Sequence, residues 1–314
     1  MTNDPPSDGR VADATRLNWV DRFCPPWSRP WLRLSRADRP AGTWLLLLPC
    51  WQSLALAIAA TGWRIDDLWL FLAMGIGAFL MRGAGCTWND ITDRDFDGKV
   101  ERTRSRPIPS GQVTARGALI WMIAQALMAF CILLTFNMFS IWLGILALLP
   151  VAIYPFMKRV TWWPQIFLGV AFNWGALMGW AAHSGSLSLA PVVLYLAGIA
   201  WTLHYDTIYA HQDKEDDALI GVKSTARLFG ADTGRYLAVF ATVATLGAGA
   251  AVLLALSGTA MIVGLAGVAL YGLHMVRQLR ALDIDDVDLC LRLFRQNRDT
   301  GLILVIAFLI AGLV

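Results

Sequence analysis

The sequence has little charge. Only 16% of its 314 residues are Asp, Glu, Lys or Arg, whereas 57% are hydrophobic. A soluble globular domain has roughly 25% charged residues, so the composition excludes that class. The charges that remain are clustered between long apolar runs, which is typical of a polytopic membrane protein.

Other absences narrow the function. The basic residues form no continuous stripe, which argues against nucleic-acid binding. The five cysteines are scattered and form no CxxC pair, and the four histidines form no cluster, so neither a disulfide framework nor a zinc site is expected. Residues 1–21 lack both the apolar core of a secretory signal and the acid-poor composition of a transit peptide. We expect a disordered cytoplasmic tail of a bacterial inner-membrane protein, with residues 1–33 as the polar tail and 34–314 as the membrane domain.

Nine apolar segments are long enough, or nearly so, to cross a bilayer. The last segment is short, and its helix would begin earlier in the sequence than the apolar run. The Lys and Arg residues concentrate before the first segment and after the second, fourth, sixth and eighth, which by the positive-inside rule places the N-terminus in the cytoplasm and the C-terminus in the periplasm. The segments cover residues 43–62, 67–88, 114–136, 139–156, 163–183, 189–210, 236–256, 259–276 and 299–314.

Two acidic motifs follow the second and sixth segments. In the first, Asn89, Asp93 and Asp97 recur every four residues, so a helix would present them on one face. In the second, Asp206, Asp213 and Asp217 are spaced by seven and four, which again predicts one helical face. Both motifs fall on the predicted cytoplasmic side.

Carboxylates at this density stay ionised together only if cations neutralise them. Oxygen ligands without His or Cys favour Mg²⁺, which typically bridges a few carboxylates to substrate phosphates. Two acidic faces across a cavity would hold a diphosphate through Mg²⁺ ions. Basic side chains at Lys158 and Arg159 would either satisfy the positive-inside pattern or contact diphosphate oxygens. Arg82 lies inside an apolar segment, where an ionisable residue normally faces a cavity or a partner.

These motifs resemble the UbiA superfamily of intramembrane aromatic prenyltransferases. Asn89, Asp90, Asp93 and Asp97 match its NDxxDxxxD motif. Asp213 and Asp217 match its DxxxD motif, and Tyr205, Asp206 and Tyr209 match the preceding YDxxY element. Stretches at residues 36–42, 81–86, 106–111, 154–159 and 221–226 are similar to those of 4-hydroxybenzoate polyprenyltransferases of ubiquinone synthesis, and the resemblance runs from about residue 34 to the end.

The resemblance implies nine transmembrane helices around a central cavity, with cytoplasmic caps and an opening toward lipid. It also implies Mg²⁺-dependent transfer of a polyprenyl group from a polyprenyl diphosphate to the ring carbon ortho to the hydroxyl of 4-hydroxybenzoate. Besides the two substrates, the expected partner is the lipid bilayer, and no protein partner is inferred. The expected role of Asn89, Asp93, Asp97, Asp213 and Asp217 is Mg²⁺–diphosphate binding, and that of Arg36, Arg82, Asn89, Lys158 and Arg159 is substrate binding. The expected catalytic residues are Asp206, Tyr209 and Arg159, of which Asp206 and Tyr209 would orient the acceptor or take its proton.

Several alternatives stay open. Asp206 would serve equally as a metal ligand. Asn173 would face the cavity or make an interhelical hydrogen bond, and Trp174 and Trp201 would line the cavity or pack in the core. A related enzyme with another aromatic acceptor fits the same motifs. From a different class, an ion-coupled transporter would suit intramembrane charges and an apparent repeat, although its ion site would be expected near the bilayer midplane.

Overall fold

The computed structural model describes residues 18–98, 103–219 and 221–314, with the side chains of residues 95–97, 216 and 217 excepted. Within these residues the secondary structure is helical throughout, which confirms the all-α prediction. The chain divides into two compact units, which are taken in turn below. The first comprises Met1–Thr43 and Ile76–Ile132, and the second comprises Trp44–Gly75 and Leu133–Val314.

The first unit begins with two short helices, α1 (Trp19–Phe23) and α2 (Arg29–Leu34). The Asn18 side chain caps α1 by accepting a hydrogen bond from the backbone N–H of Asp21. The indole of Trp19 donates to the carbonyl of Ala37 at 2.7 Å. Part of the segment that the sequence assigned to a polar tail is therefore helical and packed, while residues 1–17 lie outside the described part, and the tail boundary stays a prediction.

The rest of the first unit is formed by residues 76–97 of α4 (Asp66–Asp97) and by α5 (Ala115–Leu133). Its core contains Trp31 and Trp121, with ring centroids 5.8 Å apart. The hydroxyl of Ser35 accepts from the Trp121 indole at 2.8 Å and donates to Oε1 of Gln125 at 2.9 Å. A Cβ at Gly83 would lie 2.0 Å from that oxygen, so a larger residue there would displace the Gln125 side chain.

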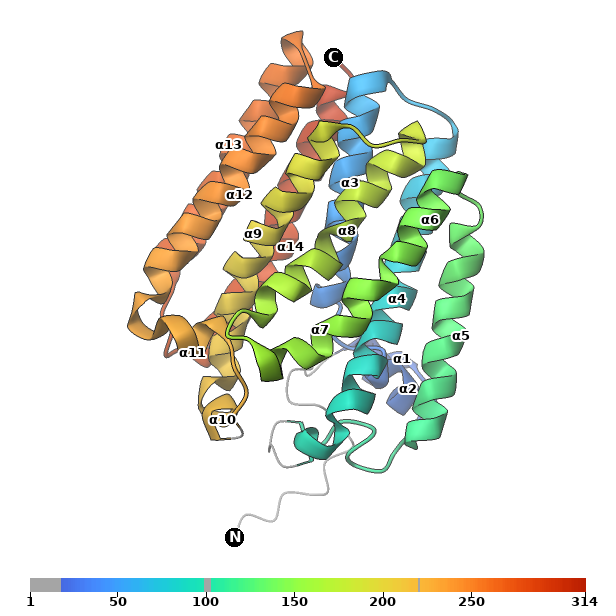
Figure 1. Cartoon of the computed structure of the whole chain (residues 1–314), viewed down its shortest axis with the longest axis vertical. Coiled ribbons are helices and arrows are strands. Elements are labelled where there is room, and N and C mark those ends of the chain that lie inside the picture. The colour runs from blue at the N-terminus through green and yellow to red at the C-terminus, as the bar shows by residue number, and fades with distance from the viewer. Residues whose placement is uncertain (1–17, 99–102, 220) are drawn as a thin grey trace. The chain divides into compact units, whose positions relative to one another are not determined.

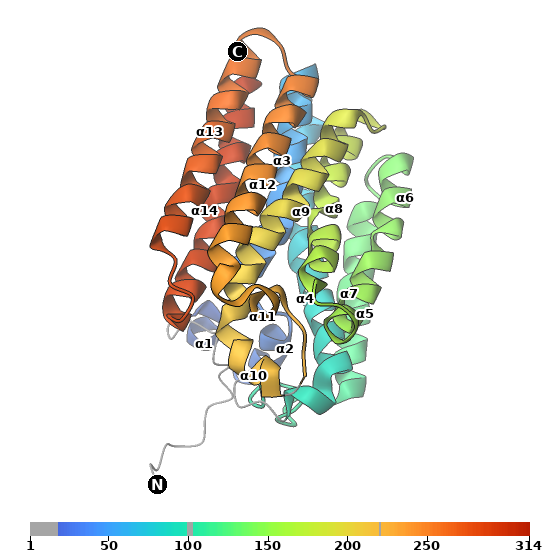
Figure 2. The ribbon, with the colours of Figure 1, turned by 60° about the vertical axis from the view of Figure 1, so that its left-hand side comes forward.

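The second unit is built around α9, which lies between α8 and α12 in both views (Figures 1 and 2). Helix α14 packs against α9 and α13, and α6 and α7 pack against α8. Most of α3 also belongs to this unit. The helices and turns are α3 (Ala41–Thr61), α6 (Met138–Leu146), α7 (Leu148–Val160), α8 (Pro164–Ser184), α9 (Leu189–Ala210), η1 (His211–Asp213), α10 (Lys214–Leu219), α11 (Thr225–Phe229), η2 (Gly230–Asp232), α12 (Thr233–Ala255), α13 (Gly258–Ala281) and α14 (Val287–Ala311).

Small residues and polar pairs hold these helices together. A Cβ at Gly179 of α8 would lie 2.2 Å from the carbonyl oxygen of Cys50 in α3. The buried Trp201 of α9 donates its indole N–H to Asn297 of α14 at 2.8 Å, and Asn297 donates to Gln278 of α13 at 3.3 Å. Between helices in lipid, close backbone approach and hydrogen bonds replace the hydrophobic driving force that operates in water.

Each of the nine apolar segments coincides with a helix or a helix pair. The segment at 139–156 is divided at Ala147 into α6 and α7, where Pro150 in the first turn of α7 has no N–H to continue the α6 ladder. The last segment starts earlier, as α14 begins at Val287. Six spans in the described part of the chain are long and apolar enough to cross a membrane, one of them covering α6 and α7 together. The protein is therefore a multi-pass membrane protein.

Candidate active site

The first acidic motif lies on the last turns of α4. Because α4 continues without a break to Asp97, Asn89 and Asp93 share one helical face, as the spacing predicted. Asp93 is buried, with 1% of its side chain exposed. Asp97 belongs to the same helix, but its side chain is among those the structure does not describe.

Asp90 lies next to that face and points elsewhere. Its side chain is fully buried, and Oδ1 accepts hydrogen bonds from Arg36 at 2.6 Å and from Arg106 at 3.4 Å. Its Oδ2 has no hydrogen-bond partner among the described residues. The sequence motif included Asp90 but gave it no role. The structure shows that it ties the motif helix to the segments before α3 and after α4.

Arg36 has an uncommon backbone conformation. Its φ is +58°, which makes it the one non-glycine residue of the described chain in the left-handed region. Burial opposes the charge of Arg36, but the attraction of Asp90 and the hydrogen bond to it more than offset burial and raise the pKa. A charged residue kept in a costly conformation is typical of a functional site, and this favours the predicted anion-binding role of Arg36.

Further charges surround this pair in the first unit. The guanidinium of Arg82 lies against Gly42 at the start of α3. A Cβ placed on Gly42 would be only 2.5 Å from Nη2 of Arg82. Asp38 is 1% exposed and lies 3.6 Å from Arg39. Burial raises the pKa of Asp38, and Arg39 and Arg36 offset part of that shift. Cationic groups thus collect beside the motif helix, as binding of an anionic substrate requires.

The second motif is not on one continuous helix. Helix α9 ends at Ala210, the 3₁₀ turn η1 covers His211–Asp213, and α10 begins at Lys214. Each residue of a 3₁₀ turn advances about 120° and each residue of an α-helix about 100°. The predicted single helix through Asp206, Asp213 and Asp217 is therefore interrupted at η1, but Asp206 and Asp213 still differ in direction by only about 40°. The side chain of Asp217 is outside the described set.

The basic end of α7 lies beside the loop that follows the second motif. The backbone N–H of Lys223 donates to the carbonyl of Lys158 at 3.0 Å, and its Nζ donates to the carbonyl of Val160 at 3.1 Å. Lys158 is half-buried and Arg159 is exposed. The fold thus brings together, within the second unit, the basic pair and the loop after the motif, which are more than 60 residues apart in sequence.

Asp206 and Tyr209 lie at the end of α9, and both are half-buried. The ring of Tyr209 packs against Phe294 of α14 at a centroid distance of 4.5 Å. His211 contacts Thr233 at 3.1 Å, and burial, followed by the charge of Lys214, lowers its pKa to about 4. Tyr209 is therefore positioned by aromatic packing, and His211 is neutral at physiological pH.

Two residues with open alternatives have structural roles. Asn173 donates to Thr202 at 2.7 Å and so links α8 to α9, which confirms the interhelical hydrogen bond. Trp201 is 1% exposed and makes edge contacts with Tyr205 and Tyr271, which confirms core packing. The indole of Trp174 donates to the carbonyl of Leu143.

The predicted metal ligands divide between the units, with Asn89, Asp93 and Asp97 in the first and Asp213 and Asp217 in the second. Among the described side chains, His, Cys, Asp and Glu form no group of three that would hold a metal ion. Asp97 and Asp217 lie outside the described side chains. An all-oxygen donor set with a buried carboxylate at Asp93 fits Mg²⁺ in its chemistry.

Known proteins are similar to this chain in sequence or in fold. The model of the UbiA prenyltransferase family matches residues 46–311. The 4-hydroxybenzoate polyprenyltransferase, mitochondrial, of Rattus norvegicus is 47% identical over 286 residues, which cover 91% of this chain and 75% of the rat protein. The apo structure of a UbiA homolog from Aeropyrum pernix K1 has a TM-score of 0.70 at 23% identity and covers 86% of this chain and 98% of that one. A UbiA homolog from Archaeoglobus fulgidus, bound to GPP and Mg²⁺, has a TM-score of 0.68 at 18% identity and covers 91% and 100%.

Proposed function

Because the chain belongs to the UbiA prenyltransferase family, we propose that it transfers a polyprenyl group from a polyprenyl diphosphate to 4-hydroxybenzoate in ubiquinone biosynthesis. The new bond forms at the ring carbon ortho to the hydroxyl. The observation that carries this proposal is the 47% identity, over 91% of the chain, to a rat enzyme with that name. The stretches at residues 36–42, 81–86, 106–111, 154–159 and 221–226, which resemble those of 4-hydroxybenzoate polyprenyltransferases, support the same acceptor.

Asn89, Asp93 and Asp97, with Asp213 and Asp217, would hold Mg²⁺ against the diphosphate. Bound there, Mg²⁺ supplies charge neutralisation for the departing diphosphate. The bound GPP and Mg²⁺ of the Archaeoglobus fulgidus homolog support this cofactor. The described members of the set are Asn89 and Asp93, aligned on one face of α4, and Asp213 at the end of η1.

The basic residues bind the anionic ends of both substrates. Lys158 and Arg159 contact the diphosphate or the carboxylate of the acceptor, and their fixed charge stabilises the negative charge that develops as the C–O bond breaks. Arg82 and Arg36 are further anion-binding groups. The Arg36–Asp90 pair, at 2.6 Å, orients the guanidinium before substrate arrives, so that less ordering is needed during the reaction.

The acceptor ring then attacks the allylic carbon, and loss of the ring proton restores aromaticity. Asp206 and Tyr209, half-buried at the end of α9, orient the acceptor or take that proton. The site has to exclude water, since water would trap the allylic cation as an alcohol. A lipid-open cavity within nine spans, capped on the cytoplasmic side, provides that exclusion.

The activity is tested in membranes with radiolabelled 4-hydroxybenzoate, several polyprenyl diphosphates, and either Mg²⁺ or EDTA. We expect a prenylated product with Mg²⁺ and none with EDTA. Asp93→Asn and Asp213→Asn, which keep size but remove charge, should each lower kcat by at least about 100-fold, the scale expected for loss of one electrostatic group. A folded protein that forms no product with Mg²⁺ contradicts the proposal.

A matched control is Asp288→Asn, because Asp288 is an exposed carboxylate in the first turn of α14. This variant should keep wild-type activity. Equal losses in Asp93→Asn and Asp288→Asn would show that the assay reports general damage and would remove the support for the metal assignment.

We place the protein in a bacterial plasma membrane with nine spans, a cytoplasmic N-terminus and a periplasmic C-terminus. Cell fractionation tests this location, which differs from the mitochondrial location in the names of the relatives given above. In a background without the five native cysteines, a cysteine at Ser186 should react with an impermeant thiol reagent in intact cells. A cysteine at Ser110 should react only after permeabilisation, and the reverse pattern would invert the topology.

A further inference from the structure

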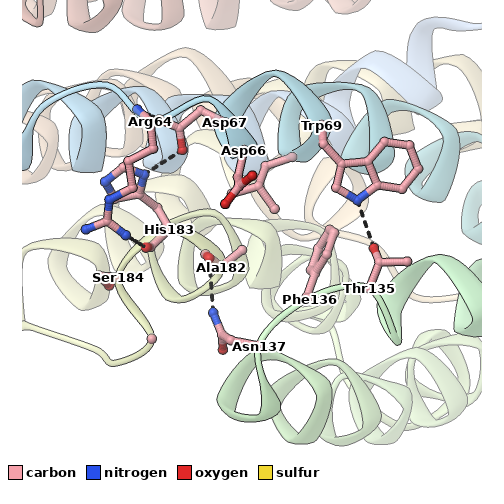
Figure 3. A pocket seen from close by; sticks show the side chains of 12 residues that line it. Arg64, Asp66, Asp67, Trp69, Thr135, Phe136, Asn137, Ala182, His183 and Ser184 are labelled. Atoms are coloured by element: carbon pink, nitrogen blue, oxygen red, sulfur yellow. Dashed lines mark hydrogen bonds and ion pairs between the residues drawn. The ribbon is translucent and has the colours of Figure 1, made fainter.

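A second site lies at the end of the second unit away from its acidic motif. Three segments surround a cavity of about 570 Å³: the α3–α4 connection, the α5–α6 connection and the end of α8 (Figure 3). This is within the range of roughly 300–1,000 Å³ for small-molecule sites. Helix α9 begins just after this cavity, at Leu189, so the cavity and Asp206, the first carboxylate of the second motif, are about 25 Å apart along its axis.

One wall is a buried, hydrogen-bonded pair of His183 and Asp67. Nδ1 of His183 lies 2.7 Å from Asp67, and Nε2 lies 2.7 Å from the hydroxyl of Thr61. That hydroxyl also donates to the carbonyl of Ala57 at 2.9 Å. The second oxygen of Asp67 accepts from the backbone N–H of Arg64 at 2.7 Å. This wall is satisfied internally and is not available to a ligand.

The other walls are also formed in advance. Asn137 donates to the carbonyls of Ala181 and Ala182 at 2.8 and 3.0 Å, which joins the α5–α6 connection to α8. The indole of Trp69 donates to Thr135 at 2.9 Å, which joins it to α4. A cavity whose three sides are connected in this way needs little reorganisation to receive a ligand.

The two charged groups that remain available to a ligand, Asp66 and Arg64, have opposite charges. The carboxylate of Asp66 lies between the Arg64–His183 side and the Trp69–Phe136 side of the cavity (Figure 3). Asp66 is exposed and has neither a hydrogen bond nor an ion pair within the described residues. The guanidinium of Arg64, also exposed, uses one nitrogen on the carbonyl of His183 and keeps further donors.

We propose that this cavity binds the headgroup of a zwitterionic aminophospholipid. Arg64 receives the phosphate, since a guanidinium matches phosphate oxygens with paired donors. Asp66 receives the ammonium group, and the face of Trp69 adds a cation–π contact. The helix ends of a multi-pass protein lie at the membrane surface, where tryptophan is enriched and where such headgroups are concentrated. The acyl chains remain in the bilayer beside the exposed Leu68 and Leu72.

The test measures lipid binding to the purified full chain by native mass spectrometry after delipidation, with phosphatidylethanolamine and phosphatidylglycerol of matched acyl chains. We expect stronger binding of phosphatidylethanolamine. Asp66→Asn and Arg64→Gln should each weaken it about tenfold, as loss of one charge-assisted contact would. The controls Asp288→Asn and Arg280→Gln, exposed groups at other helix ends, should bind as wild type does.

Three results overturn the proposal: equal binding of the two lipids, unchanged binding by both cavity variants, or equal weakening by the controls. Soluble phosphoethanolamine that competes as well as the intact lipid would also overturn it, because the ligand would then be a free metabolite. Prenyl transfer by Asp66→Asn should stay at the wild-type level, which shows that the variant is folded and separates this site from the proposed active site.

Discussion

Removing the carboxylate of Asp90 should destabilise the protein strongly. Asp90 is 0% exposed, and its ion-pair partners Arg36 and Arg106 have side chains that are only 9% and 13% exposed. Asp90→Ala leaves two buried guanidinium groups without their shared anion. Breaking a buried pair by removing one partner costs about 3–5 kcal/mol, which is a large share of the roughly 5–15 kcal/mol that holds a typical domain folded.

The chain contains a matched surface pair. Arg298 and Asp299 are 2.7 Å apart, nearly the 2.6 Å of Arg36 and Asp90, but their side chains are 50% and 48% exposed. Asp299→Ala should cost less than about 1 kcal/mol, because solvent screens exposed pairs. Asp90→Ala and Asp299→Ala therefore test how burial changes the stability contribution of an ion pair, because the N–O distance is almost the same in both pairs.

The free energy of unfolding is measured in detergent for Asp90→Ala and Asp299→Ala. A third variant, Arg36→Met with Asp90→Leu, removes the buried carboxylate of Asp90 and the guanidinium of Arg36 together. This double variant should lose less stability than Asp90→Ala, since no unpaired Arg36 remains. If Asp90→Ala is no more destabilising than Asp299→Ala, the buried pair does not hold the motif helix in place and the reasoning is refuted.

Three further predictions concern stability. Arg36→Gly should be about 1 kcal/mol more stable than Arg36→Ala in thermal unfolding, because φ at this position is +58° and both variants lose the guanidinium; equal stabilities would contradict the left-handed backbone. Burial raises the pKa of Asp38 in the folded protein. The contribution of Asp38 to the free energy of unfolding is therefore complete below the pKa of the unfolded state and is lost as the pH rises through the pKa of the folded state. Asp38→Asn should thus gain stability relative to wild type as the pH increases from 4 to 8, and a gain that shrinks over this range would contradict the reasoning. Gly179→Ala should cost about 1–3 kcal/mol, because its Cβ would meet the Cys50 carbonyl at 2.2 Å, whereas Gly77→Ala has open space and should be neutral or stabilising.

The sequence alone determined the class of protein and the local geometry of one motif. Shortage of charge and long apolar runs require helices, because backbone groups in lipid have to be satisfied within each segment. The four-residue spacing of Asn89 and Asp93 predicted a shared face correctly, since α4 is continuous there. Helical periodicity is a local property, and it holds wherever nothing interrupts the helix.

The tertiary structure decided which residues meet. Asp90 pairs with Arg36 across 54 positions of sequence, and no periodicity relates a helix to the loop that packs against it. The 3₁₀ turn at His211–Asp213 interrupts the helix that the sequence predicted through the second motif, a break that the spacing of the acidic residues did not indicate. The cavity with Asp66 forms only where three connections meet, and such a meeting depends on the folded arrangement of helices and not on the order of residues in any one of them.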